Sequence, residues 1–371
     1  MRDEGITLRP LFGGRGDDAS ASSMPLLLAG PCSAESEEQV EATARDLAAL
    51  GIRYFRAGIW KPRTRPGSFE GVGARGLKWL RKSASRHGMV PLTEVANAAH
   101  LRAALRAGIR NFWIGARTAA NPFAVQELAD VFASLPEEEK ADISILVKNP
   151  VNPDLELWIG ALQRLNAAGV QRLGAIHRGF GAYGETIYRN RPEWRLPIEL
   201  KRRIPALPVI CDPSHIAGRR GLVEQVARQA VAMDFDGLIL ECHCNPEAAL
   251  SDKEQQLTPQ ELSQLLPTLS KRTGGEASAA LKAFREEIDA IDAEIVVLLA
   301  RRMAVADEIG ELKRKEGIPV LQPERYCSLM ERRVEEAEKL GLSPQFMRKV
   351  FSTIHDESVG RQINPSGNNE K

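Results

Sequence analysis

Two apolar runs in the second half of the chain each end in side chains that bind divalent metals. Residues 208–210 and 237–240 show no alternation of polar and apolar side chains, which is typical of parallel strands covered by helices on both faces. His215 follows the first run, Glu241 follows the second, and Asp252 lies a short distance further along. One imidazole and two carboxylates suit a first-row divalent metal. On this stretch alone, a turn-capping histidine and two solvated acids are an equal alternative.

Polar side chains follow all eight strand-like runs between residues 25 and 270. In chain order they are Cys32, Arg56 with Lys61-Pro62-Arg63-Thr64, Glu94, Arg117, Lys148, Arg178, His215 and Glu241. The excess of cations suits phosphorylated substrates, because arginine offers forked donors that match phosphate and carboxylate groups. Solvated surface charge explains any one of these residues well, but it explains the set badly. Arg117 and Lys148 could instead be structural ion-pair partners of Glu94.

The elements that must position these residues alternate between strand and helix. We expect strands at 26–29, 54–60, 90–95, 111–115, 144–147 and 172–176 and from 209 and 238, with helices at 36–50, 77–86, 98–107, 123–135, 155–168, 198–204, 222–233 and 259–269. Eight such units in roughly 245 residues predict an α/β fold of the (β/α)8 TIM barrel type rather than a doubly wound sheet. No Gly-x-Gly-x-x-Gly follows the first strand, which argues against dinucleotide binding.

The strand signal ends at a glycine-rich segment, 274–278, which we interpret as a linker. Three helices are expected beyond it, at about 279–315, 323–339 and 344–363. Apolar residues recur every three and four positions along the first of them, at Leu281, Phe284, Ile288, Ile291, Ile295 and Leu298. This helix would be about 55 Å long, more than a monomeric three-helix fold can cover. The pattern therefore predicts a second, all-α domain that dimerises.

Three cations of the first C-terminal helix have unusual positions. Arg302 lies on the apolar seam, and Lys313 lies on nearly the same side roughly 16 Å further along. Two long side chains at these positions could close on a small dianion. Alternatively, the stem of Arg302 packs while its head reaches water. Arg285 is rotated about a quarter turn away and would serve a different site.

Composition limits the class of protein. The chain has 371 residues, 43% of them hydrophobic and 27% charged, which predicts two or three soluble domains. A net charge of +1 gives no general attraction to nucleic acid. No apolar run is long enough to span a membrane and the first residues lack a secretory signal, so we expect a cytoplasmic protein. The five cysteines suit reduced thiols and metal chemistry better than disulfides.

Five motifs resemble 3-deoxy-D-arabino-heptulosonate 7-phosphate (DAHP) synthase of the short type I-beta, over residues about 25–270. They are Gly30-Pro31-Cys32-Ser33, Lys61-Pro62-Arg63-Thr64, Ile114-Gly115-Ala116-Arg117, Asp212-Pro213-Ser214-His215 and the segment from Glu241 to Asp252. The resemblance implies that Cys32, His215, Glu241 and Asp252 hold one divalent metal, with Mn expected and Fe, Co or Zn as alternatives. It implies phosphoenolpyruvate at Arg117, Lys148 and Arg178, Lys61 beside its reacting carbon, and erythrose 4-phosphate at Arg63 and Thr64. Arg56 and Glu94 would complete the surroundings of the substrates.

The reaction implied by this resemblance is an aldol-like condensation. The methylene carbon of phosphoenolpyruvate attacks the aldehyde, water adds at the neighbouring carbon, and phosphate leaves. Enzymes that make 3-deoxy-D-manno-octulosonate 8-phosphate share the barrel, but Pro62-Arg63 favours erythrose 4-phosphate. Departures from the family are His177, where many synthases carry an acid, and the cysteines Cys242 and Cys244, neither of which replaces a ligand.

The C-terminal segment resembles the all-helical AroQ-type chorismate mutase, over about 80 residues without a gap. The matching positions are Arg285, Arg302, Lys313, Arg325, Ser358 and Gln362. The resemblance implies that the three arginines hold the carboxylates of chorismate, that Lys313 and Gln362 contact its ether oxygen, and that Arg285 reaches into the partner's site. Gln322 and Tyr326 stand where acids are common, which leaves hydroxyl recognition open. The alternative is a non-catalytic module that senses a ligand and dimerises.

Together these observations predict a bifunctional enzyme of the shikimate pathway. We expect an N-terminal lead at 1–24, a barrel at 25–272, a linker at 273–279, a helical mutase domain at 280–365 and a polar tail at 366–371. A homodimer through the mutase domain is expected. The polar lead is too short for a regulatory domain, so we expect feedback by prephenate through the mutase site. The alternative is that the fusion only links the expression of two enzymes.

Overall fold

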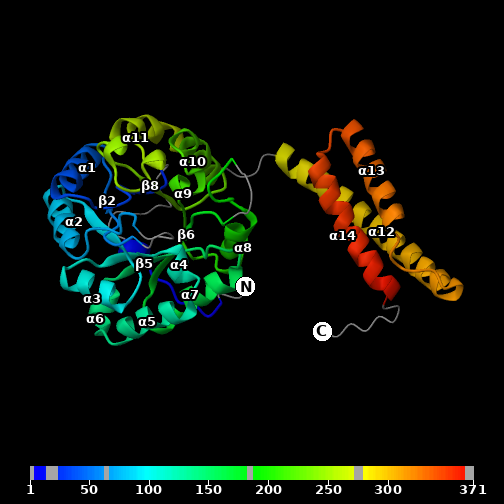
Figure 1. The fold of residues 1–371 in the computed structure, drawn as a ribbon, viewed down its shortest axis with the longest axis horizontal. Helices are drawn as coiled ribbons and strands as arrows, with labels where there is room; N and C mark the ends of the chain where they lie inside the picture. Colours follow the sequence, from blue (N-terminus) through cyan, green and yellow to red (C-terminus); the bar gives the residue numbers. More distant parts are fainter. Residues whose placement is uncertain (1–3, 14–23, 62–66, 182–186, 271–278, 364–371) are drawn as a thin grey trace. The chain divides into compact units, whose positions relative to one another are not determined.

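The protein consists of two compact units, residues Met1–Thr273 and Gly274–Lys371, in a computed structural model (Figure 1). The structure describes residues 4–13, 24–61, 67–181, 187–270 and 279–363. The expected linker and polar tail lie almost entirely outside these ranges.

Eight parallel strands form a closed barrel in the first unit. They are β1 (Leu26–Gly30), β2 (Tyr54–Arg56), β3 (Val90–Val95), β4 (Asn111–Ile114), β5 (Ser144–Lys148), β6 (Arg172–His177), β7 (Val209–Cys211) and β8 (Gly237–Glu241). Each strand pairs with the next in the sequence, and β1 closes the barrel against β8 with Leu28 opposite Ile239. The predicted TIM barrel is confirmed, and the carboxyl ends of all eight strands lie at one mouth.

Helices surround the barrel, as Figure 1 shows. The main helices are α1 (Glu37–Ala49), α2 (Arg75–Arg86), α3 (Ala98–Arg106), α5 (Pro122–Ala133), α7 (Leu155–Ala167), α8 (Arg195–Arg203), α10 (Val223–Ala232) and α11 (Pro259–Leu265). Side-chain caps mark the N-terminal ends of α1, α3, α5, α7 and α11, and at α11 Thr258 and Glu261 form a capping box. The structure also contains three short helices that the sequence did not predict. Helices α4 (Ala116–Ala119) and α9 (Pro213–Ala217) follow β4 and β7, and α6 (Glu137–Ala141) precedes β5.

Strand β2 is shorter than predicted. It ends at Arg56, whereas the apolar pattern suggested a strand up to Trp60. Beyond Arg56 the chain turns toward the loop after β1, where the Ala34 amide donates to Gly58 O at 2.9 Å and the Gly58 amide donates to Cys32 O at 3.3 Å. These bonds hold the loops after β1 and β2 together at the mouth.

The N-terminal lead is more than a polar segment. Ile6 is buried in the layer between strands and helices, and Leu11 is buried with the side chains that fill the barrel interior. The ring of Phe12 stacks on Tyr54 with 4.3 Å between centroids. Residues 4–13 therefore pack apolar side chains against the barrel, a contribution that the neighbouring glycines and serines conceal in the sequence.

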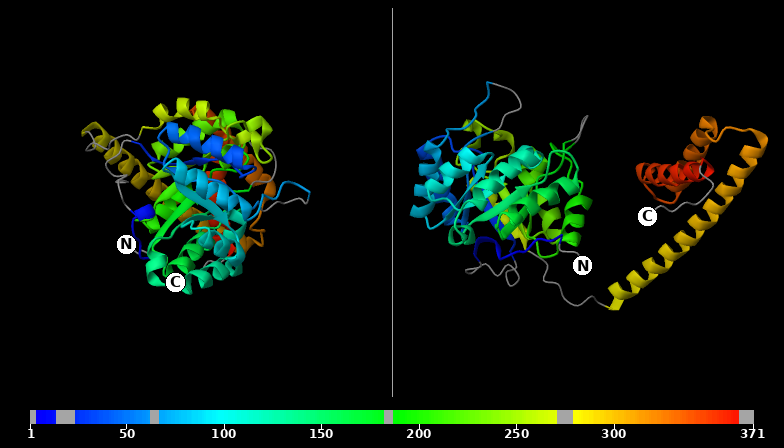
Figure 2. Two further views of the ribbon diagram at one scale, coloured as in Figure 1. Left: turned by 90° about the vertical axis from the view of Figure 1, so that its left-hand side faces the viewer. Right: turned by 90° about the horizontal axis from the view of Figure 1, so that it is seen from below.

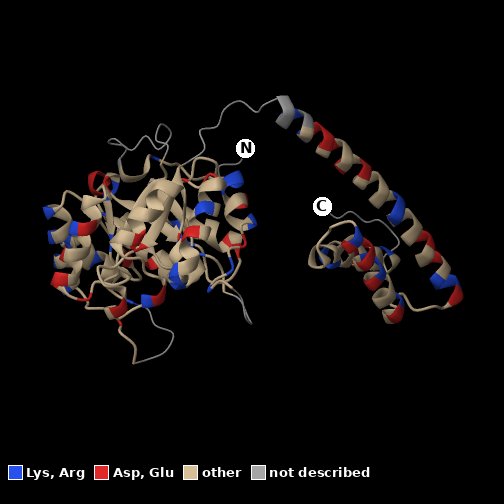
Figure 3. Ribbon diagram, turned by 90° about the horizontal axis from the view of Figure 1, so that it is seen from above, with Lys and Arg blue, Asp and Glu red and all other residues tan. Residues whose placement is uncertain are grey.

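The second unit contains three helices, α12 (Ala279–Glu316), α13 (Pro323–Lys339) and α14 (Pro344–Ile363), as predicted. Met303 and Ala306 of α12 are buried, and Gly310 lets α12 approach Gln362 of α14 closely. Helix α14 packs against both α12 and α13 (Figure 2). Acidic and basic segments alternate along α12 (Figure 3). Within the described residues, no helix is long and apolar enough to cross a membrane.

Candidate active sites

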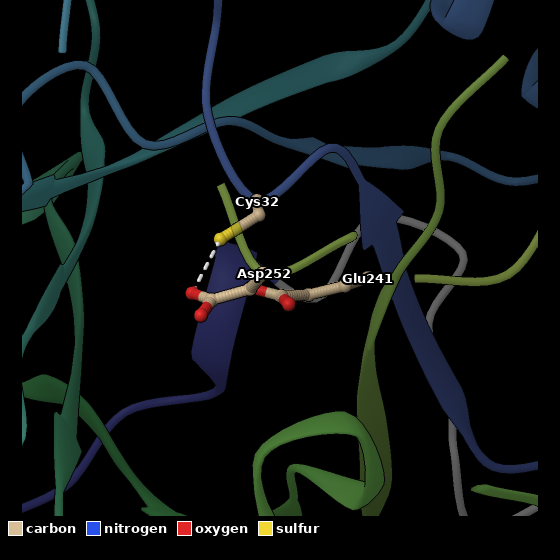
Figure 4. A group of neighbouring side chains, drawn as sticks. All are labelled: Cys32, Glu241 and Asp252. Carbon is tan, nitrogen blue, oxygen red and sulfur yellow. Dashed lines mark hydrogen bonds between the residues drawn. The ribbon is translucent and has the colours of Figure 1, made fainter. Parts of the chain in front are cut away.

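Three of the predicted metal ligands meet at the mouth of the barrel. Cys32, in the loop after β1, Glu241, at the end of β8, and Asp252 each offer an atom within 4.8 Å of the others (Figure 4). The Cys32 thiol donates to Asp252 Oδ2 at 3.1 Å. The approach of the β1 loop requires Gly30, which has φ +152° and where a Cβ would lie 2.0 Å from Arg56 O. A larger side chain at this position would push the cysteine loop away.

His215, the fourth predicted ligand, lies beside this cluster. Its Nε2 is 3.8 Å from Glu241 Oε1. Its Nδ1 is 2.8 Å from Asp212 Oδ2, and the Asp212 side chain also caps α9 by accepting from the His215 amide. A carboxylate at Nδ1 fixes the proton there and leaves Nε2 as the nitrogen that can bind a metal.

The chemistry of these residues fits a divalent cation. Glu241 is fully buried, and its Oε1 accepts no hydrogen bond. Burial and the nearby Glu241 raise the pKa of the Cys32 thiol to about 12, so the thiol stays protonated until a cation replaces its proton. One sulfur, one imidazole nitrogen and two carboxylates form a donor set that a first-row metal satisfies.

Two cations lie directly against the cluster. Lys61 Nζ is 2.9 Å from Cys32 Sγ and 3.9 Å from Asp252 Oδ2. Burial lowers the pKa of Lys61, but the electrostatic interactions with Cys32, Glu241 and Asp252 outweigh it and raise the pKa overall. Arg56 is 1% exposed, with Nη2 3.3 Å from Glu241 Oε1, and its guanidinium lies over the Trp113 ring.

A cavity of about 160 Å³ opens beside these candidate ligands. Its lining includes seven residues that the sequence predicted: Lys61, Glu94, Arg117, Lys148, Arg178, His215 and Asp252. Lys148 Nζ donates to Asp212 Oδ2 at 2.8 Å, and Arg178 Nη1 donates to Asn190 Oδ1 at 2.7 Å. Glu94 accepts from the Trp113 indole at 2.8 Å, so the alternative of an ion pair between Glu94 and Lys148 is not what the structure contains. The remaining predicted residues, Arg63 and Thr64, lie outside the described residues.

The departures noted in the sequence have structural explanations. His177 is fully buried and packs against the rings of Phe180, Trp194 and Phe235. This burial lowers its pKa to about 3, so His177 is a neutral residue of the core. Cys242 is buried in the same large apolar core.

Four residues contact the candidate site residues but were not predicted from the sequence. Asp212 connects Lys148 to His215, and the Gln256 side chain accepts from the Cys32 amide at 2.9 Å. Arg189 donates to Asp252, and Gln255 donates to Glu241. Asp212 directly follows β7, the same position relative to a strand as several of the residues that were predicted. The long connection 178–194 was a usable signal, because long loops in compact domains are usually functional.

The second unit brings together part of its predicted site. The Arg302 guanidinium donates to Ser358 Oγ, and Lys313 Nζ donates to Val320 O at 2.8 Å. Gln362 is 9% exposed, and its Oε1 is buried without a hydrogen bond. Exposed Arg325 and half-buried Tyr326 lie in the first turn of α13, and the ring centroids of Tyr326 and His355 are 4.4 Å apart. Arg285, also exposed, lies about 25 Å along α12 from Arg302.

A TIM barrel with a cluster of candidate metal ligands and a cation-lined cavity, followed by a three-helix unit, is typical of an enzyme. The family model of the DAHP synthetase I family matches residues 16–275, and that of chorismate mutase type II matches residues 284–363. The chain therefore belongs to the DAHP synthetase I family and carries a C-terminal chorismate mutase domain of type II.

Individual relatives agree with this assignment. The chain is 33% identical over 246 residues to a phospho-2-dehydro-3-deoxyheptonate aldolase of Thermotoga maritima, covering 66% of this chain and 69% of the relative. A crystal structure of a DAHP synthase of Thermotoga maritima matches with a TM-score of 0.58 and 32% identity, covering 65% of this chain and 67% of that one. A T-protein of Enterobacter agglomerans is 39% identical over 80 residues, 22% of this chain and 21% of the relative.

Proposed function

We propose that the barrel makes DAHP from phosphoenolpyruvate and erythrose 4-phosphate at one divalent metal, with Mn²⁺ expected and Fe, Co or Zn as alternatives. Cys32, His215, Glu241 and Asp252 would hold this ion. The observation that carries the proposal is the convergence of three of these side chains beside a cavity lined by cations. When bound, the metal supplies a Lewis acid for the aldehyde oxygen.

The protein side chains bind and orient the two substrates. Arg117, Lys148 and Arg178 neutralise the phosphate and carboxylate of phosphoenolpyruvate, and Arg63 and Thr64 take the phosphate of erythrose 4-phosphate. Lys61 is held in its charged form by the anions around it, so it is a proton donor beside the reacting carbons. Glu94 and Arg56 fix the walls of the site.

Removal of the metal tests this proposal. Treatment with a chelator should abolish consumption of phosphoenolpyruvate, and Mn²⁺ should restore it. Full activity in the metal-free protein would contradict the metal assignment, and a preference for arabinose 5-phosphate over erythrose 4-phosphate would contradict the substrate assignment.

We propose that the helical unit rearranges chorismate to prephenate rather than serving only as a sensor. Arg302, Arg325 and Arg285 would hold the two carboxylates, while Lys313 and Gln362 would contact the ether oxygen, where charge develops during the reaction. The buried Gln362 Oε1 without a hydrogen bond supports this, because a polar atom in that state favours a ligand partner. Lys313→Ala should abolish prephenate formation while DAHP synthesis continues. Normal mutase turnover in that variant would remove the assignment.

A homodimer is part of this proposal. Phe284, Ile288, Ile291, Ile295 and Leu298 form an apolar ridge on α12 and are between 46% and 63% exposed within one chain. If the ridge packs on a second copy, Arg285 can complete the partner's site. Arg285→Ala and Lys313→Ala should each be inactive as mutases. When the two variants are unfolded and refolded together, half of the dimers are mixed and each mixed dimer holds one intact site, so the mixture should show about a quarter of the wild-type mutase activity. No recovery from the mixture would contradict shared sites.

We further propose that prephenate bound at the mutase site lowers the DAHP synthase activity of the barrel. Such coupling requires different prephenate affinities in two states of the protein and is reciprocal, of the order of 1–3 kcal/mol. In the full chain, Arg302→Met should abolish inhibition by prephenate without changing uninhibited synthase activity. If the variant is still inhibited at the same prephenate concentrations as the wild type, the inhibitor binds outside the mutase site. The fusion would then serve only to link the expression of two enzymes.

A further inference from the structure

One guanidinium connects the outer oxygens of two metal carboxylates. Arg189 Nη1 donates to Asp252 Oδ1 at 3.1 Å and to Gln255 Oε1 at 2.7 Å. Gln255 Nε2 in turn donates to Glu241 Oε2 at 2.7 Å. The amide of Gln255 can satisfy both neighbours only in this orientation, because its oxygen faces a donor and its nitrogen faces an acceptor.

These bonds leave the inner oxygens of the same carboxylates for a metal. Asp252 Oδ2 is the oxygen that lies 3.1 Å from Cys32 Sγ, and Glu241 Oε1 is the oxygen without a hydrogen bond. Fixing one oxygen of each carboxylate fixes the direction of the other. The network therefore holds two ligands in the orientation that faces the thiol.

Asp252 has particular need of such support. Its backbone has φ 46° and ψ 37°, a left-handed conformation that is unfavourable for a residue with a side chain. Lys61 Nζ, 3.9 Å from Asp252 Oδ2, offers a competing ion pair. Without Arg189, the Asp252 side chain would be free to turn toward Lys61 and away from the metal position.

We propose that Arg189 and Gln255 are positioning residues that set the metal affinity of the site formed by Cys32, His215, Glu241 and Asp252. This inference rests on the metal site proposed above. It extends the site to Arg189, in the connection between β6 and α8.

Charge alone predicts the opposite effect of removing Arg189. A guanidinium near a cation repels it, so its loss should tighten metal binding if Arg189 acts only through its charge. If Arg189 instead orients the ligands through hydrogen bonds, its loss should weaken metal binding. Removing residues that hydrogen-bond to metal ligands typically lowers metal affinity by about 10- to 100-fold. The sign of the change in dissociation constant therefore separates the two roles.

The test measures metal binding directly in the full chain. Mn²⁺ titrations followed by electron paramagnetic resonance give the dissociation constant, and Co²⁺ spectra report a sulfur-to-metal band from Cys32. Arg189→Met and Gln255→Met should each raise the Mn²⁺ dissociation constant about 10-fold or more. Gln255→Met removes no charge, so it tests the network independently of electrostatics. Arg189→Lys should recover part of the affinity, since an ammonium can still donate to Asp252.

Arg219→Met is the matched control. Arg219 lines the same cavity of about 560 Å³ as Arg189 and Asp252, but it donates to Ile187 O at 2.7 Å. Its replacement should leave the dissociation constant within about threefold of wild type. Unchanged or tighter Mn²⁺ binding in Arg189→Met, or an equal loss in Arg219→Met, would overturn the inference. A wild-type protein without metal binding or a cobalt–sulfur band would instead refute the metal site itself.

Discussion

Replacing Asp212 with asparagine should destabilise the barrel strongly, because Asp212 neutralises a buried ammonium. Asp212 is fully buried, Lys148 is 4% exposed, and their charged atoms are 2.8 Å apart. Burial raises the pKa of Asp212, but His215 and Lys148 outweigh it and hold the pKa well below its usual value. Removing one partner of such a pair costs about 3–5 kcal/mol, since the other charge stays buried alone.

Proton release sets an upper limit on this loss. A stranded ammonium can become neutral, and at pH 7 an ordinary lysine with a pKa of about 10.4 does so at a cost of about 1.36 × 3.4, or 4.6 kcal/mol. At pH 9 the same limit falls to about 1.9 kcal/mol. The unfolded variant then binds more protons than the folded one, so its stability rises with pH relative to wild type. We expect a loss of about 3–4.6 kcal/mol at pH 7 that shrinks toward pH 9.

Tryptophan fluorescence during urea unfolding measures this loss in the full chain. All five tryptophans belong to the barrel: Trp60, Trp79, Trp113, Trp158 and Trp194. With an m-value of about 3 kcal/mol/M, the midpoint of Asp212→Asn should fall by about 1 M or more at pH 7. Asparagine can still accept the His215 amide, so loss of the helix cap does not explain such a shift.

The double variant Asp212→Asn/Lys148→Met is the control for charge. Removing both charges should recover most of the lost stability, since no unpaired ion remains. Three results would refute this reasoning. They are a loss of unfolding free energy below about 1 kcal/mol in Asp212→Asn, a double variant that is as unstable as Asp212→Asn, and a loss that grows between pH 7 and pH 9.

Three further predictions concern other parts of the chain. Burial raises the pKa of Glu41, but hydrogen bonds from Arg86, Ser83 and His87 outweigh it and lower the pKa to about 2. Glu41→Gln should therefore lower the free energy of unfolding by at most about 1 kcal/mol at pH 7. The urea midpoints of the variant and the wild type should converge as the pH falls from about 4 toward 2, where Glu41 becomes protonated. Gly30→Ala should both destabilise the barrel and weaken Mn²⁺ binding, because the new Cβ would lie 2.0 Å from Arg56 O. A wild-type urea midpoint together with a wild-type Mn²⁺ dissociation constant would contradict this close approach. Ile288→Asp should convert the proposed dimer to monomers in light scattering, while Ala293→Asp on the opposite face of α12 should not.

The sequence determined the fold and most of the barrel site. Apolar runs without alternation identified the strands, and parallel strands in a closed barrel necessarily bring their carboxyl ends to one mouth. Residues that follow strands, such as Glu94, Lys148 and Glu241, could therefore be placed together before any coordinates existed. The helices of the second unit were equally clear because their apolar period and their punctuation by Gly341 and Pro344 are local properties.

Only the tertiary structure decided which side chains support these residues. Arg189, Gln255 and Asp212 act through side-chain contacts made between different loops, whose conformations no local period encodes. Burial likewise decided that His177, next to Arg178 in the sequence, belongs to the core, since successive residues of a strand point to opposite faces. The packing of Ile6 and Leu11 against the barrel depends on segments more than a hundred residues away, such as Asn166, which bonds to Thr7. Contacts of this kind arise from the closed barrel as a whole, and the sequence of each segment alone does not contain them.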